Sequence, residues 1–244
     1  MATIALQLYT VREALNHDLD GGLAAIAAMG YTHVELAGLY GGTAGQLKAK
    51  LDANGLTAVA GHDAWISDTA DPTAAVETAR VFGYDHVVQP FWPDDKRTAA
   101  GYAQIADAIN AQNVDGITFG YHNHDFEFQT LDDGRTGFDV IFDNTGVTAE
   151  LDTCWAVVAG IDTPALIAKL AGRLPLIHVK DCRDLAAKTL TEIGTGVVPI
   201  KDILAAANDA GTEYFVVEQD NNWIDGDPLK SAQISLENLK GMLG

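Results

Sequence analysis

The residues with the clearest chemical potential lie at positions 120–128, Gly-Tyr-His-Asn-His-Asp-Phe-Glu-Phe, directly after the strand-forming residues 117–119. Strand side chains alternate between two faces, so His122 and His124 are predicted to point the same way. Two imidazoles and the carboxylate of Glu127 at a strand end are typical ligands of a divalent metal ion. The alternative interpretation is that both histidines are structural. It is less well supported because three later strands also end on residues that can bind a metal ion.

These three later strand ends carry Asp152, His178 with Lys180, and Glu218. Taken singly, Asp152 has an explanation as a turn or helix-capping residue and His178 as a core histidine. Glu218 follows the apolar residues 215–217, and burying an unpaired carboxylate costs several kcal/mol. Carboxylates and imidazoles together suit Mn, Co or Zn, and no thiolate ligands accompany them.

The elements that must position these residues alternate regularly between strands and helices. Strands are predicted at residues 4–9, 32–37, 57–60, 86–91, 117–124, 148–153, 176–179 and 214–217. Helices are predicted at 21–29, 44–53, 72–82, 97–111, 138–142, 163–171, 199–210 and from 228 onward, and Asp71 is the expected N-cap of the third. Eight strand–helix units in 244 residues, without a linker, predict an α/β fold, a single-domain (β/α)8 TIM barrel over residues 1–244.

In such a barrel the chemistry lies at the carboxyl ends of the strands, which meet at one mouth. The predicted strand ends carry Glu35, His62, Gln89, His122, His124, Asp152, His178, Lys180 and Glu218.

Composition narrows the class of partner. Asp and Glu total 34 against 15 Lys and Arg, which gives a net charge of −19. This charge argues against nucleic acid and against an anionic membrane as partners. Cys154 and Cys182 lie in apolar or strand-like contexts, and no signal peptide or membrane-spanning run is evident. We therefore expect a cytoplasmic protein without disulfides.

The chain resembles the xylose-isomerase-like TIM barrel superfamily, in its sugar phosphate isomerase/epimerase branch, over essentially its whole length. The most specific motifs are Tyr-His-Asn-His at 121–124, Leu-Asp-Thr at 151–153, His-Val-Lys-Asp at 178–181 and Val-Glu at 217–218. This resemblance implies one divalent ion held by a Glu, an Asp, a His and a Glu from strands 5 to 8. Asp152, His178 and Glu218 match the last three ligands.

Two positions depart from the family pattern. Many relatives end strand 5 in Glu-Asn-His, where this chain has His122-Asn123-His124. Either His122 ligates the ion, which is the interpretation we favour, or Glu127 folds back to supply the missing carboxylate. Trp155 stands where related epimerases carry a substrate-contacting His, which suggests stacking on a sugar or cyclitol ring, with packing at the barrel rim as the alternative.

The resemblance also implies proton abstraction alpha to a carbonyl, with the metal as Lewis acid stabilising an enediolate. The candidate acid–base groups are Glu218, His124, Lys180 and Glu127, and the candidate substrate contacts are Glu35, His62, Gln89 and Trp155. The expected function is a metal-dependent isomerase or epimerase of a small sugar, keto sugar or cyclitol.

Three other functions compete with this one. A dehydratase acting on an inosose or 3-keto sugar would use the same site. A non-catalytic sugar-binding barrel is disfavoured because Asp152, His178 and Glu218 are all present, and a DNA-repair endonuclease is disfavoured by the acidic charge. Residues 194–196, Gly-Thr-Gly, are the nearest candidate for a phosphate loop, although we interpret them as a plain turn. Family habit suggests a dimer or tetramer.

Overall fold

The computed structural model describes residues 2–67 and 70–244, and its centre is a closed parallel barrel. Around the barrel, the strands follow the order β1-β10-β7-β6-β5-β4-β3-β2, so each barrel strand pairs with the barrel strand before it in the chain, and β1 closes the barrel against β10. The strands are β1 (Thr3–Gln7), β2 (His33–Leu36), β3 (Thr57–His62), β4 (His86–Gln89), β5 (Thr118–His122), β6 (Thr148–Asp152), β7 (Leu176–Val179) and β10 (Tyr214–Val217). The predicted (β/α)8 barrel is confirmed.

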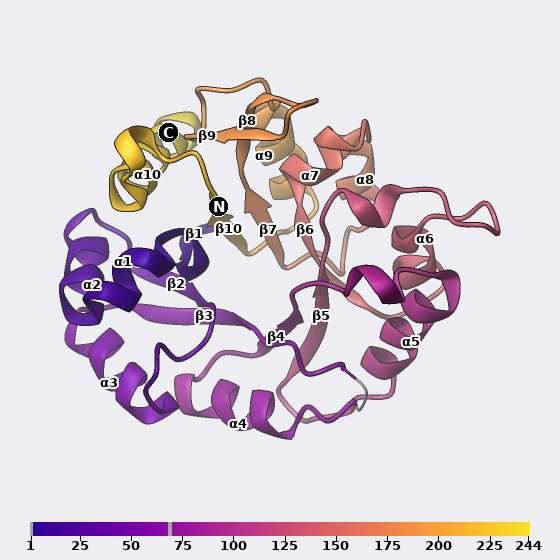
Figure 1. Cartoon of the computed structure of the whole chain (residues 1–244), viewed down its shortest axis with the longest axis horizontal. Coiled ribbons are helices and arrows are strands. Elements are labelled where there is room, and N and C mark those ends of the chain that lie inside the picture. The colour runs from indigo at the N-terminus through magenta and orange to yellow at the C-terminus, as the bar shows by residue number, and fades with distance from the viewer. Residues whose placement is uncertain (1, 68–69) are drawn as a thin grey trace.

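Helices form an outer ring around the barrel (Figure 1). They are α1 (Arg12–His17), α2 (Leu19–Ala28), α3 (Ala44–Ala53), α4 (Thr73–Phe82), α5 (Ala99–Asn110), α6 (Gly137–Phe142), α7 (Thr153–Val158), α8 (Thr163–Lys169), α9 (Ile200–Asp209) and α10 (Pro228–Leu243). Local sequence explains several starts: Thr43 and Gln46 form a capping box on α3, and Asp162 caps α8. No helix in the described ranges combines the length and apolarity needed to cross a membrane.

The structure corrects one local expectation and adds elements that were not predicted. The N-cap of α4 is Pro72, and Asp71, one residue before it, accepts hydrogen bonds from the backbone N–H and the hydroxyl of Thr73. Helix α7, which follows β6 without a loop, was not predicted. A two-stranded antiparallel sheet, β8 (Asp181–Asp184) with β9 (Thr189–Thr191), was also not predicted and is inserted between β7 and α9.

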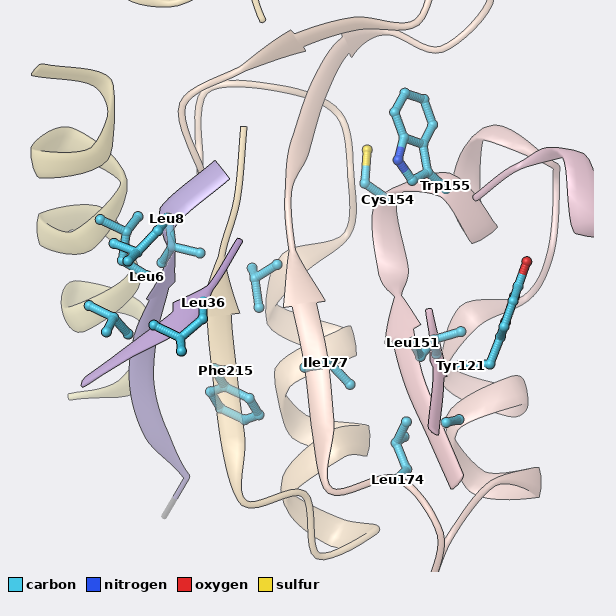
Figure 2. Packing of buried hydrophobic residues seen from close by; sticks show 14 of the residues in the cluster. Leu6, Leu8, Leu36, Tyr121, Leu151, Cys154, Trp155, Leu174, Ile177 and Phe215 are labelled. Atoms are coloured by element: carbon cyan, nitrogen blue, oxygen red, sulfur yellow. The ribbon is translucent and has the colours of Figure 1, made fainter. Parts of the chain in front are cut away.

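Strand alternation divides the core into an outer layer and a barrel interior. Leu6, Ile177 and Phe215 belong to the outer layer, where strands β1, β7 and β10 face the helices (Figure 2). Their neighbours point inward, and a small apolar cluster of Ala5, Val59, Ala60, Leu176 and Val216 fills part of the interior. Residues i, i+2 and i+4 of a strand share one face, so polar residues two or four positions after these inward apolar residues also face the interior.

Candidate active site and metal centre

The carboxyl ends of the barrel strands bring together most of the predicted site residues. His178 on β7 and Lys180, the residue directly after β7, share the inward face with Leu176, and on β6 Asp152 alternates with the outward Leu151. Glu35 from β2, His62 from β3, His122 from β5 and Glu218 after β10 approach the same region. All of these residues are buried except His62, which is partly exposed.

Four of them form the predicted metal tetrad. His122, Asp152, His178 and Glu218 each offer one ligand atom, and these atoms lie within 4.8 Å of one another. His122 Nε2 lies 3.8 Å from Asp152 Oδ2, and His178 Nδ1 lies 2.5 Å from Glu218 Oε2. Two imidazoles and two carboxylates in this arrangement are a donor set that suits a divalent transition metal.

Lys180 places a positive charge beside this tetrad. Its ammonium Nζ lies 2.9 Å from Asp152 Oδ2, 2.8 Å from Glu218 Oε2 and 3.0 Å from Asp220 Oδ2. Burial would lower the pKa of Lys180, but the three carboxylates outweigh it and raise the pKa well above its usual value. The lysine is therefore a fixed cation whose charge partly balances the carboxylates.

A residue absent from the sequence prediction, Glu150, lies at the centre of the site. Its Oε2 atom is 2.6 Å from His62 Nε2, 2.9 Å from His122 Nδ1 and 3.2 Å from His178 Nε2. Glu150 is 1% exposed, so its charge has no access to solvent. The signal in the sequence is its spacing: Glu150 precedes Asp152 by two residues and so shares the inward face of β6.

Glu150 also belongs to a second, deeper group of ligand-type residues. His62, His122, Glu150 and His178 place one ligand atom each within 4.8 Å of one another. Glu35 adjoins this group, with Oε2 2.7 Å from His178 Nε2. Glu35 Oε1 and Glu150 Oε1 are buried and accept no hydrogen bond from the described residues, which is the environment expected of groups that face a cation.

Burial and neighbouring charges set the protonation states of these groups. Burial and the nearby His178 lower the pKa of His122 to about 4, which keeps this imidazole neutral. Burial opposes protonation of His178, but Glu150, Glu218 and Glu35 raise its pKa well above the usual value. Burial and Glu150 raise the pKa of Glu35 to about 7. A neutral imidazole can bind a metal ion, and His178 would lose its proton on binding one.

His124 lines the open side of the site. Its ring stacks on Phe126, with centroids 4.9 Å apart and planes 10° apart, and its centroid is 6.5 Å from that of Trp155. Burial, His122 and Lys180 lower its pKa well below the usual value. Its Nδ1 atom forms no hydrogen bond with the described residues. His124 therefore presents a neutral, uncommitted imidazole beside the cavity.

Glu127 lies away from both ligand groups. Its Oε1 accepts the hydroxyl of Tyr121 at 2.6 Å and its Oε2 accepts the backbone N–H of His124 at 2.7 Å. The short helical turn Phe126–Phe128 directs this carboxylate toward Tyr121 and leaves it out of both tetrads. Glu127 thus anchors the loop that carries His124, and the geometry favours His122 over Glu127 as the ligand from β5.

A cavity of about 360 Å³ opens over these residues, a size within the range of small-molecule sites. The cavity is lined by Tyr9, Ala37, His62, Pro90, Phe91, His122, His124, Lys180, Glu218 and Asp220. Tyr9 and Phe91 are 43% and 44% exposed, so two aromatic rings are available at the rim.

Of the four predicted substrate contacts, His62 lines the cavity, whereas Glu35, Gln89 and Trp155 are not among the lining residues. Glu35 adjoins the deeper group, and the other two lie behind the cavity wall. Gln89 accepts the N–H of Ile66 and donates to the carbonyl of Phe91, both at 3.0 Å, and so holds two strand-end loops. Trp155 is buried, and the ammonium of Lys180 lies 5.5 Å from the centre of its ring. Both residues support the cavity from behind its wall.

The loop at 194–196 is already filled by a carboxylate of the chain itself. Asp181 Oδ2 accepts the N–H groups of Gly194 and Gly196, each at 2.9 Å, and its Oδ1 accepts those of Cys182 and Val198. Converging backbone N–H groups of this kind bind anions. Because Asp181 occupies them, this loop offers no place for a phosphate.

Comparison with known proteins agrees with the fold. A sugar phosphate isomerase/epimerase from Parabacteroides distasonis has 22% identity and a TM-score of 0.83, over 98% of each chain. The IolI protein, solved with a zinc atom bound, has 12% identity and a TM-score of 0.72, over 98% of this chain and 97% of its own. A probable 3-DHS dehydratase, AsbF, from Bacillus anthracis has 13% identity and a TM-score of 0.65, over 98% and 99%.

No curated protein matches the chain in sequence. The sequence model of one family does match, over residues 23–242, which is most of the chain. On this evidence the chain belongs to the xylose isomerase-like TIM barrel family.

Proposed function

We propose that this protein is a divalent-metal-dependent isomerase or epimerase acting on a small sugar, keto sugar or cyclitol. The observation that carries the proposal is the buried tetrad of His122, Asp152, His178 and Glu218 below a cavity of about 360 Å³. Related structures of isomerase/epimerase type, and one with zinc bound, support this assignment.

The tetrad would hold one ion of Mn, Co or Zn, with Asp152 and Glu218 supplying charge and His122 and His178 supplying neutral nitrogens. When bound, the ion would act as a Lewis acid toward a substrate carbonyl and so acidify the adjacent C–H group. The unpartnered oxygens of Glu35 and Glu150 lie in the adjoining group and add negative charge to the site.

The chain itself supplies the groups that would move the proton. His124 is neutral and lines the cavity, so we assign it as the general base. Burial opposes ionisation of Glu218, but Lys180 and His178 lower its pKa well below the usual value, so Glu218 would act as a second proton acceptor. It approaches from β10, which is separated from β5 by two strands, and the proton that His124 takes would return from His124 to the substrate. Lys180, also at the cavity wall, would hold the substrate oxygen on which negative charge develops.

The cavity favours an uncharged substrate over a phosphorylated one. Of its lining residues in the described part of the chain, Lys180 is the one Lys or Arg, and three carboxylates already surround it. Arg12 stacks on Tyr9 but donates to the backbone carbonyls of Tyr9 and Asp220. The exposed rings of Tyr9 and Phe91 suit the apolar face of a sugar or cyclitol.

One observation favours a dehydratase as the second candidate. Asp220 lines the cavity beside Lys180, and burial raises its pKa to about 6. A carboxyl group of that pKa can protonate a leaving hydroxyl. In that reaction His124 takes the proton alpha to the carbonyl, the C–O bond to the beta carbon breaks, and the hydroxyl leaves as water with the proton of Asp220.

The test is solvent exchange. The protein is incubated in D₂O with Mn²⁺, Co²⁺ or Zn²⁺ and a panel of ketohexoses, 3-keto sugars and inososes, and NMR follows deuterium entry and new products. We expect metal-dependent exchange at a carbon alpha to the carbonyl, which His124→Gln abolishes and Glu127→Gln retains. Exchange without any metal, or in the His124→Gln variant at the wild-type rate, would contradict the proposed mechanism.

A further inference from the structure

The two histidines of the metal tetrad each have one nitrogen facing the tetrad and one facing deeper into the barrel. His122 Nε2 faces Asp152, whereas its Nδ1 lies 2.9 Å from Glu150 Oε2. His178 Nδ1 faces Glu218, whereas its Nε2 lies 2.7 Å from Glu35 Oε2 and 3.2 Å from Glu150 Oε2. Both rings are therefore held from behind by buried carboxylates.

Glu150 is the carboxylate that these rings share. One of its two oxygens, Oε2, accepts hydrogen bonds from His62 and His122 and lies 3.2 Å from His178 Nε2. These three histidines come from β3, β5 and β7. A carboxylate that accepts the N–H of a ligating histidine fixes its tautomer and orientation and makes the opposite nitrogen a better ligand. The charge of Glu150 lies directly behind His122, on the side away from Asp152.

We propose that Glu150 is a positioning residue of the metal centre, which fixes His122 as the Nδ1–H tautomer and so presents its Nε2 atom to the ion. The same carboxylate assists Glu35 in holding His178, whose Nδ1 atom then faces the ion. This inference rests on the proposed function, because it assumes an ion at the tetrad of His122, Asp152, His178 and Glu218.

The competing arrangement makes Glu150 a ligand. An ion at the deeper group of His62, His122, Glu150 and His178 would use His122 Nδ1 and His178 Nε2. Those are the nitrogens that already hydrogen-bond to Glu150 and Glu35. His178 is hydrogen-bonded to a carboxylate at both nitrogens, so His122 distinguishes the two positions. Its Nδ1 lies 2.9 Å from Glu150 Oε2, whereas its Nε2 lies 3.8 Å from Asp152 Oδ2, beyond hydrogen-bond distance, and is the nitrogen left for an ion. Glu218 also lines the cavity and Glu150 does not, so the geometry favours the tetrad with Asp152 and Glu218 over the deeper group.

The test measures binding of Zn²⁺ alone to the metal-free protein by calorimetry. Glu150→Gln keeps the shape and one acceptor oxygen but removes the charge, and Glu127→Gln is the matched control, a buried glutamate outside both ligand groups. We expect Glu150→Gln to bind Zn²⁺ about 10- to 100-fold more weakly than wild type. The control should bind with wild-type affinity.

Two further readouts separate positioning from ligation. His62 belongs only to the deeper group, so His62→Gln should weaken binding by less than about tenfold, and this variant serves if Glu150→Gln fails to fold. In ¹⁵N spectra of the zinc-loaded wild type, His122 should be metal-bound at Nε2 and protonated at Nδ1. A purely structural role for Glu150 would not fix these nitrogens.

The outcomes divide cleanly. Wild-type affinity in Glu150→Gln, or His122 bound through Nδ1, overturns the inference. Loss of Zn²⁺ in both Glu150→Gln and His62→Gln, with retention in Asp152→Asn, places the ion in the deeper group and also overturns it. If the wild type binds no ion at all, the proposed function fails together with the inference, whereas dependence on Asp152 without dependence on Glu150 removes the inference alone.

Discussion

Glu127→Gln is expected to make the protein's stability less dependent on pH, because Glu127 is a buried carboxyl group. Burial raises its pKa from the ordinary 4.5 to about 7 in the folded protein. Between these two values the folded state binds the proton more tightly than the unfolded state does. Protonation of Glu127 therefore stabilises the fold at low pH, and this contribution is lost as the pH rises through about 7.

The size of the effect follows from the two pKa values. At about 1.4 kcal/mol per pKa unit, the difference corresponds to ~3 kcal/mol of folding free energy between pH 4 and pH 8. Glutamine is uncharged, its oxygen can accept the N–H of His124, and its NH₂ group can donate to the oxygen of Tyr121. The substitution thus keeps the contacts of Glu127 and removes the charge.

The assay compares thermal unfolding of wild type and Glu127→Gln at pH 5 and pH 8. Every other titrating group is common to both proteins, so it cancels in the difference. Over the narrower range from pH 5 to pH 8 the same pKa values give about 2.5 kcal/mol, so the variant should gain about 5–10 °C relative to wild type. An offset in melting temperature that is the same at both pH values would refute the reasoning.

Three further perturbations test other parts of the structure. Lys180→Met leaves Asp152 and Glu218 without their buried counter-charge and should destabilise the metal-free protein by ~3–5 kcal/mol. Adding Zn²⁺ should restore part of this stability. An unchanged melting temperature would contradict the ion pairs described for Lys180. Gly196→Ala would place Cβ 2.2 Å from Asp181 Oδ1 and 2.4 Å from the carbonyl oxygen of Cys182, so it should lower the free energy of unfolding by ~1–3 kcal/mol. In the helical control Gly241→Ala, the new Cβ meets no atom within 4 Å. A Gly196→Ala variant that melts at the same temperature as the control would refute the clash. A phosphorylated ketose should protect the protein against thermal unfolding less than the unphosphorylated sugar, and stronger protection would contradict the uncharged-substrate assignment.

The barrel could be predicted because each strand is a short apolar run bounded by turn residues. The predicted ranges 176–179 and 214–217 agree at both ends with β7 and β10. Helix α7 could not be found in this way, because Asp152 is both the last residue of β6 and the N-cap of the helix, so no turn separates the two elements. The β8–β9 hairpin is short and polar, and its segment has no strong strand periodicity.

The sequence could predict only those site residues that lie at the ends of predicted strands. His122, Asp152 and His178 meet as expected because barrel closure brings the same ends of all strands together. Glu150 was missed because its importance depends on histidines from three other strands, which local sequence does not reveal. Glu127 was expected at the site on the basis of proximity in sequence, but the turn that follows β5 directs it to Tyr121.

The most direct test of the central claim is the metal content of the purified protein, measured by elemental analysis after incubation with Mn²⁺, Co²⁺ and Zn²⁺. Wild type and the Glu127→Gln control should each retain about one divalent ion per chain, and both Asp152→Ala and His122→Ala should lose it. A wild-type protein that retains no ion, or an Asp152→Ala variant that retains its ion in full, would contradict the account.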